Sequence, residues 1–180
     1  MARYWNPKVC SRKKRDKRPK TKNGIKPLST FTLTTANIAS WCDRIELPYA
    51  LDTDSGHVHI PHPTNQEWVI RVIPREAQNM ITFGLVVPYQ VPEECLDELD
   101  RTVSRLNSRT FMGSWVLNHT ARSIYFRVTL LSTETQYNDE GVLYILQTIF
   151  NTSNANAQLI RLVAQEGQTY EQARATVSES

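Results

Sequence analysis

The stretch from Asn138 to Gln165 constrains the fold most, because its apolar residues recur at steps of three and four along most of its length. That spacing lines up the side chains on one face and predicts a long amphipathic helix. The face consists of Val142, Ile145, Leu146, Ile149, Ser153, Ala157 and Ile160. Asn138 suits the N-cap position and Gly167 is a stop signal, so we expect the helix to begin and end beside these residues.

The first half of this helix carries more apolar surface than one face of a sheet would cover. Every residue between Val142 and Leu146 is apolar or aromatic. A second apolar surface must therefore cover it, and we interpret this as a contact with a partner or with a second copy of the chain. The predicted partner or dimer surface consists of Val142, Leu143, Leu146, Ile149 and Phe150. A homodimer is the working hypothesis.

Two more helices and six strands are expected before the long helix. Helical periodicity with capping or proline signals covers residues 34–45 and 92–109. Alternating or continuous apolar segments predict strands at 49–51, 57–62, 68–74, 80–87, 111–117 and 124–131. The connections among the first four strands are too short for parallel crossovers, so these strands should form an antiparallel meander, and the last two strands should form a hairpin. The predicted class is α+β, with the sheet packed by three helices in the order α-β-β-β-β-α-β-β-α.

The composition fits one domain with tails. A chain of 180 residues with 40% hydrophobic residues can build one full core and is short for two. We expect a basic tail at 1–28, a domain at 29–167 and a fraying C-terminal tail at 168–180. No apolar run approaches the roughly 18 to 20 residues of a membrane span. The N-terminus also lacks the apolar core of a secretion signal, so a cytoplasmic location is expected.

The charge is strongly divided along the chain. Residues 1–27 carry eleven lysines and arginines against one acid, whereas the remainder carries ten arginines against seventeen acids. Such a basic block binds polyanions by releasing counterions, without reading a base sequence. The candidate polyanion-binding residues are Arg12, Lys13, Lys14, Arg15, Lys17, Arg18, Lys20 and Lys22. The alternatives are a solubilising tail and a tail that folds back onto its own acidic domain.

The cysteines and histidines give only a weak case for a metal. Cys10, Cys42 and Cys95 are odd in number and lack ligand spacing, so they are expected to be free thiols. The string His57, His59 and His62 is the nearest approach to a metal motif. His57 and His59 would lie on the same face of a strand about 7 Å apart. Structural or catalytic zinc needs three or four defined ligands, so half-exposed strand residues are the favoured interpretation and no metal or cofactor is predicted.

Signatures of common enzyme classes cannot be assembled from this sequence. Only six glycines occur, and their positions allow no dinucleotide fingerprint, phosphate-binding loop or nucleophile elbow. Nucleotide-binding and hydrolase functions therefore have no support. The acidic residues between 93 and 100 are interpreted as a solvated helix face that complements the helix dipole.

Five segments have a distinctive wording: "SWCDRIELPYALD", "HVHIPHP", "MITFGLVVPYQVPEECLDELDRTVSRLNSRT", "FMGSWVLNHTARSIYFRVTLL" and the closing helix. Together they resemble the YbjN family of cytoplasmic bacterial proteins, described as sensory transduction regulators and similar in structure to type III secretion chaperones. The resemblance covers about residues 30–165. The five segments are packing and turn patterns, and the basic tail is not part of the family pattern.

The resemblance implies a binding function and no catalytic residues. Secretion chaperones of this shape are usually dimers that hold extended segments of partner proteins on apolar surfaces. We therefore expect a non-enzymatic, chaperone-like or regulatory protein-binding module, dimeric, with a tail that contacts a polyanion. The alternative is a nucleic-acid-associated regulator in which the tail binds RNA or DNA and the domain dimerises. A metal-dependent enzyme built on the histidine string is a third hypothesis.

Overall fold

The computed structural model describes residues 30–65, 67–131 and 136–179, so the predicted tail contacts and Cys10 lie outside the described residues. This part of the chain contains both strands and helices, with runs of consecutive strands between the helices. The strands are β1 (Thr30–Phe31), β2 (Ala50–Asp52), β3 (His57–Pro61), β4 (Val69–Arg75), β5 (Met80–Val86), β6 (Ser114–Asn118), β7 (Ser123–Leu131) and β8 (Tyr137–Asn138). The helices are α1 (Thr35–Arg44), α2 (Leu96–Asn107), α3 (Asp139–Glu166) and α4 (Tyr170–Ser178), with short 3-10 turns at Glu76–Gln78 and Glu93–Cys95.

The main sheet has six strands in the order β2-β3-β4-β5-β7-β6, and every pair of neighbours is antiparallel. The predicted α+β class and antiparallel sheet are therefore confirmed, and the predicted elements occur in the predicted order, with β1, β8 and a fourth helix, α4, in addition. Two very short strands, β1 and β8, pair separately and join the start of the described chain to the start of α3. This small second sheet was not predicted.

The two faces of the main sheet have different side chains because strand residues alternate in direction. Val58, Val72, Phe83 and Val128 form one cross-strand row, and all of them are buried in the core. The neighbouring row points the opposite way and consists of His59, Arg71, Gly84, Arg127 and Ser114. We call the face that carries this second row the open face.

The long helix has the predicted ends. The side chain of Asn138 accepts a hydrogen bond from the backbone N–H of Gly141 at 2.7 Å, which satisfies one of the free donors of the first turn. Gly167 follows Glu166 with a φ of 66°, the left-handed conformation typical of a glycine after a helix. Local capping chemistry thus fixes both ends of α3.

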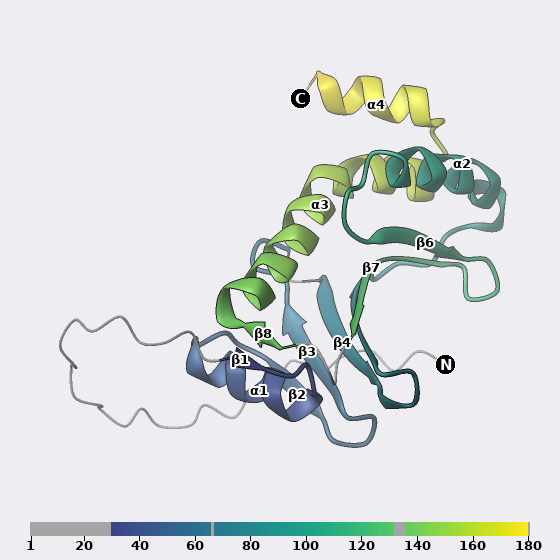
Figure 1. Cartoon of the computed structure of the whole chain (residues 1–180). Helices are drawn as coiled ribbons and strands as arrows, with labels where there is room; N and C mark the ends of the chain where they lie inside the picture. The colour runs from purple at the N-terminus through teal and green to yellow at the C-terminus, as the bar shows by residue number, and fades with distance from the viewer. Residues whose placement is uncertain (1–29, 66, 132–135, 180) are drawn as a thin grey trace.

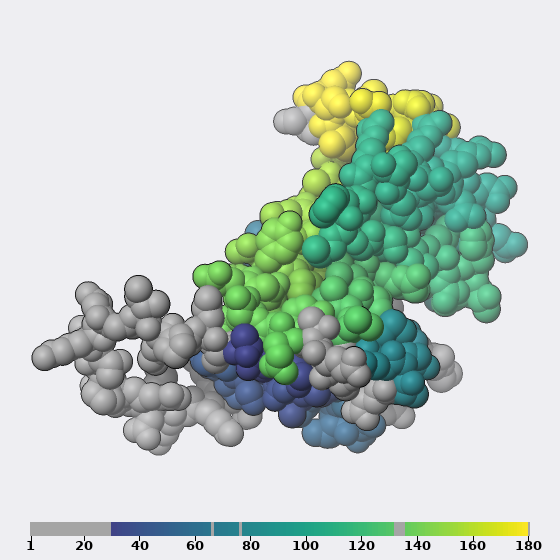
Figure 2. All heavy atoms as spheres, in the orientation of Figure 1, coloured from purple at the N-terminus to yellow at the C-terminus, as the bar shows by residue number. Residues whose placement is uncertain are grey.

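The other three helices lie near the two ends of α3 (Figure 1). Helix α1 lies near its N-terminal end, and α2 and α4 lie near its C-terminal end. Figure 2 shows the same division, with the first elements of the domain at the bottom and the yellow α4 at the top, against the region of α2. Helix α3 also contacts β7 and β8, so it holds both ends of the domain together. Within the described residues, no helix combines the length and apolarity needed to cross a membrane.

Helix α4 corrects the expectation that residues 168–180 fray. Thr169 and Gln172 form a reciprocal capping box, in which each side chain bonds to the backbone of the other. Tyr170 and Ala173 are buried, and the Arg105 guanidinium lies 4.7 Å from the centre of the Tyr170 ring. The helix is short and has few apolar residues, so its docking onto α2 and α3 was not visible as a periodic pattern.

Candidate partner-binding surface

The open face of β4, β5 and β7 forms a hollow of about 800 Å³. Arg71, Gly84 and Arg127 are directly opposite one another across these three strands. Gly84 has only a hydrogen atom in place of a side chain, so the centre of this row is open, with an arginine on each side. The hollow is lined by residues 71, 73, 75, 80, 82, 84, 86, 111–114, 125 and 127–130.

Positive charge is the main electrostatic property of this hollow. Arg71, Arg75 and Arg127 are all exposed. The ion pairs of the described residues use other cations, namely Arg44, Arg101, Arg105, Arg161 and His119. The three arginines of the open face therefore have no ion pair within the described chain. They form a local positive surface on a domain whose sequence carries more acids than arginines.

Apolar and hydroxyl side chains lie between the arginines. Ile73, Met80 and Val86 are half-buried, and each of them lines the hollow. Thr82 and Thr129 face each other across β5 and β7, with their hydroxyl oxygens 3.1 Å apart. A face of this kind can take up apolar side chains and can also pair with negative charges.

The loop before β6 forms one wall of the hollow. Gly113 has a φ of +85°, and a Cβ atom built on it would lie 2.6 Å from Phe126 Cζ and 2.7 Å from the Arg127 carbonyl oxygen. Glycine is needed here because the loop lies directly against β7. Phe111, two residues earlier, is 97% exposed. The prediction that Phe111 belongs to a strand is wrong, since β6 begins only at Ser114.

A second hollow of about 500 Å³ lies on the other side of this loop, between α2, α3 and α4. Phe111 lines both hollows. Leu106, Leu159 and Tyr170 contribute apolar surface to the second one, and Tyr144 of α3 adds a side chain that is 56% exposed. The sequence pattern did not single out Phe111 or Tyr144 as surface residues.

The residues of the predicted partner surface on α3 have two different environments in the structure. Val142, Leu146 and Ile149 are buried in the core of the same chain, so their assignment to a partner surface is wrong. The second apolar surface that the sequence required is supplied by the chain itself, because α3 is enclosed by β7, β8, α2 and α4. Leu143 remains 42% exposed and Phe150 is half-buried.

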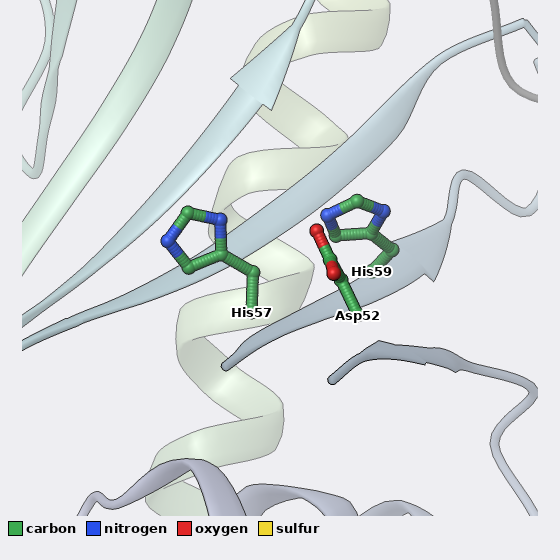
Figure 3. A group of neighbouring side chains, drawn as sticks. All are labelled: Asp52, His57 and His59. Carbon is green, nitrogen blue, oxygen red and sulfur yellow. The ribbon is translucent and has the colours of Figure 1, made fainter. Parts of the chain in front are cut away.

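The histidine string is also divided. His57 and His59 lie on the open face near the edge of the sheet, and Asp52 is opposite His57 in the neighbouring strand. One ligand atom from each of these three residues lies within 4.8 Å of the other two (Figure 3). Burial and the Arg71 charge lower the pKa of His57 and of His59, while hydrogen bonds from Ser55 lower the pKa of the Asp52 carboxyl.

His62 does not join this group, so the candidate set of three histidines is wrong in that member. Its ring is buried between Trp68 and Phe150, with ring centres 5.8 and 4.9 Å away. Nδ1 accepts backbone N–H groups from residues 64 and 65, and Nε2 lies 3.1 Å from Ser153 Oγ. Burial lowers the pKa of His62, which fits a neutral ring with its proton on Nε2.

The two described cysteines, Cys42 and Cys95, are buried and free, as predicted. Burial, together with the negative charge of Asp43, raises the pKa of the Cys42 thiol to about 12. A thiol with so high a pKa is protonated at neutral pH and is a poor nucleophile. Cys42 and Cys95 both belong to the buried core, where each packs as a small apolar group.

Comparison with known proteins agrees with this architecture. Residues 34–156 match the YbjN family, described as "Putative bacterial sensory transduction regulator". The chain belongs to the YbjN family. The matched range runs from the N-cap of α1 into α3, so the C-terminal part of α3 and all of α4 lie beyond it. The family resemblance drawn from the sequence is confirmed.

The chain is also similar to two solved structures. One is described as YbjN, "a putative transcription regulator from E. coli", with 15% identity and a TM-score of 0.57 over 72% of this chain and 96% of that chain. The other is the ExsC-ExsE complex, with 13% identity and a TM-score of 0.48 over 73% of this chain and 93% of that chain. At 15% identity, the likeness to the first of these structures concerns the fold alone. A search of curated proteins gives no match.

Proposed function

We propose that this YbjN-family protein is a non-enzymatic, protein-binding regulatory module that holds a segment of a partner protein on its open face. The observation that carries the proposal is the group of three exposed arginines, Arg71, Arg75 and Arg127, which have no ion pair within the described residues and lie among apolar side chains. Apolar surface rimmed by polar residues is typical of a protein-binding site, and the arginines favour a partner of complementary negative charge.

The chemistry of the open face selects the kind of segment it would hold. Acidic side chains would pair with the arginines, and apolar side chains would lie over Ile73, Met80 and Val86. An extended segment alternating acidic and apolar residues presents both kinds of side chain along its length. The positive face on an otherwise acid-rich domain would also steer such a segment toward the open face.

Selection from a library of random 12-residue peptides tests this proposal without knowledge of the natural partner. We expect the enriched peptides to carry an excess of Asp, Glu and apolar residues. Arg71→Gln and Arg127→Gln should each weaken binding of an enriched peptide about fivefold, the effect of roughly 1 kcal/mol for a partly exposed charge pair.

The matched control for this experiment is Arg101→Gln. Arg101 is an exposed arginine on α2, paired with Glu98, and it lies outside the hollow. Peptide affinity should not change in this variant. Enrichment of basic or neutral peptides, or equal binding by the Arg127→Gln variant and the unmodified chain, would refute the assignment of the open face.

The dimer hypothesis is best supported at the second hollow. Phe111 and Tyr144 are large exposed side chains that line it, and Leu143 is exposed on the same helix as Tyr144. Covering such side chains with a second copy would remove apolar area from water. Light scattering should show a dimer at micromolar concentration and a shift toward monomer for Phe111→Ser. A monomeric unmodified chain would refute dimerisation.

The basic tail, with the eight candidate residues between Arg12 and Lys22, is proposed to contact a polyanion. Its support is the charge of residues 1–27, which carry eleven cations against one acid. Binding of duplex DNA and single-stranded RNA should be measured at several salt concentrations, for the full chain and for a chain that starts at Leu28. Steep salt dependence in the full chain alone supports the tail contact and the alternative of a nucleic-acid-associated regulator. Absence of binding at physiological salt would refute both.

A further inference from the structure

We propose that Asp52, His57 and His59 form a binding site for Zn²⁺ or a similar transition-metal ion at the edge of the open face (Figure 3). Two imidazoles and a carboxylate are a ligand set that zinc uses in proteins, with one further position left for water or for a group from a bound molecule. The site lies outside the partner-binding hollow and does not depend on the proposed function.

The strand register brings the three ligands together. Asp52 in β2 is directly opposite His57 in β3, and His59 lies two residues further along β3 on the same face. Their ligand atoms lie within 4.8 Å of one another. In the tetrahedral geometry of zinc, with bonds of about 2.0–2.2 Å, two ligand atoms lie about 3.3–3.6 Å apart. Small side-chain rotations at the half-exposed histidines would close the set around the ion.

The carboxylate is already held in place by the turn that follows it. Oδ1 of Asp52 accepts the backbone N–H of Asp54 at 3.1 Å, and Oδ2 accepts the Ser55 hydroxyl at 2.6 Å. Such outer hydrogen bonds orient a ligand before the metal arrives and normally contribute to metal affinity. Asp52 is therefore oriented before any ion binds.

A second observation points to a missing ligand at His59. Its Nε2 atom is buried and has no hydrogen-bond partner within the described part of the chain. A buried polar atom without a partner costs free energy. Figure 3 shows a ring nitrogen of His59 beside the Asp52 carboxylate. Coordination to a metal ion would satisfy this nitrogen.

The positive charge of Arg71 is the main electrostatic repulsion that a cation would meet at this site. It is directly opposite His59 in β4, on the open face, so its charge repels a bound metal ion. Removing this charge should strengthen metal binding. Arg127 lies on the same cross-strand row but two strands beyond β4, and its removal should have little effect.

Isothermal titration of Zn²⁺ into the full, untagged chain tests the proposal. One equivalent should bind, and Co²⁺ should give a visible absorption spectrum that is lost when zinc is added. His57→Gln and His59→Gln should each reduce the affinity at least 10- to 100-fold, since even outer-shell changes reach that range. Circular dichroism of each variant checks that the domain remains folded.

His119→Gln is the matched control for the ligand variants. His119 is exposed and its Nε2 pairs with the Asp100 carboxylate at 2.9 Å, so the pair also combines a histidine with a carboxylate. His119 directly follows β6, at the opposite edge of the sheet from β2. Its substitution should leave zinc affinity unchanged, while Arg71→Gln should raise it and Arg127→Gln should not. The proposal is overturned if zinc does not saturate a single site, or if His57→Gln and His59→Gln bind zinc like the unmodified chain.

Discussion

Replacing Gly113 with alanine should destabilise the protein far more than the same change at Gly56. Both glycines have a positive φ, +85° at Gly113 and +68° at Gly56, so alanine incurs a backbone cost at either position. That cost is about 1–2 kcal/mol, partly offset by the lower entropy of the unfolded chain. For Gly56 no atom lies within 4 Å of the added Cβ, so the total should be about 1 kcal/mol.

At Gly113 a steric cost is added to the backbone cost. The added Cβ would lie 2.6 Å from Phe126 Cζ, 2.7 Å from the Arg127 carbonyl oxygen and 2.9 Å from Val128 Cγ2. Phe126 and Val128 are buried, and a backbone oxygen cannot rotate away, so β7 or the loop itself must shift. Overpacking of this kind costs about 1–3 kcal/mol, which brings the total to about 2–5 kcal/mol.

Urea unfolding followed by tryptophan fluorescence measures the difference directly. Trp41, Trp68 and Trp115 are buried in the folded domain, so unfolding changes their surroundings. Gly113→Ala should lower the free energy of unfolding by at least about 1 kcal/mol more than Gly56→Ala. Equal losses in the two variants would refute the close packing of this loop on β7, and with it the wall of the hollow.

Three further outcomes follow from the helix ends and the histidines. Tyr170→Ala should lower the free energy of unfolding by about 3 kcal/mol in urea, because it empties a buried site. Thr176→Ala, at an exposed position of the same helix, should change it by less than about 0.5 kcal/mol. Similar small losses in both variants would show that α4 is not docked. Asn138→Ala should cost about 1 kcal/mol through loss of the α3 cap, and an unchanged urea midpoint would contradict that role. Burial lowers the pKa of His62 from 6.5, so the unfolded chain binds more protons and stability should fall as the pH drops below about 6.5; a midpoint that rises from pH 7.5 to 5.5 would contradict this sign.

The sequence predicted the elements whose signals are local. Asn138 and Gly167 mark both ends of α3, and Thr34 caps α1 by accepting the backbone N–H of Asn37. Alternating apolar residues located the six strands of the main sheet, apart from the start of β6. That start was placed too early because Phe111 and Met112 look like strand residues, whereas the left-handed Gly113 breaks the pattern.

The candidate site could be predicted only in part, because it depends on which residues lie opposite one another. Periodicity placed His57 and His59 on one face, but only the hairpin register shows that Asp52 joins them and that His62 lies elsewhere. The gathering of Arg71 and Arg127 around Gly84 likewise requires the order of β4, β5 and β7. The sequence correctly indicated that α3 has more apolar surface than the sheet alone would bury. The elements that bury the rest belong to the same chain.

Mapping a selected acidic peptide onto the protein by NMR tests the central claim most directly. Backbone amide signals of the uniformly labelled full chain are recorded as the peptide is added. The account predicts that the largest shifts fall on β4, β5 and β7, around Arg71, Gly84 and Arg127, and disappear in an Arg71→Gln/Arg127→Gln double variant. Shifts confined to α2, α3 and α4, or shifts that persist in the double variant, would contradict the open face as the partner-binding surface.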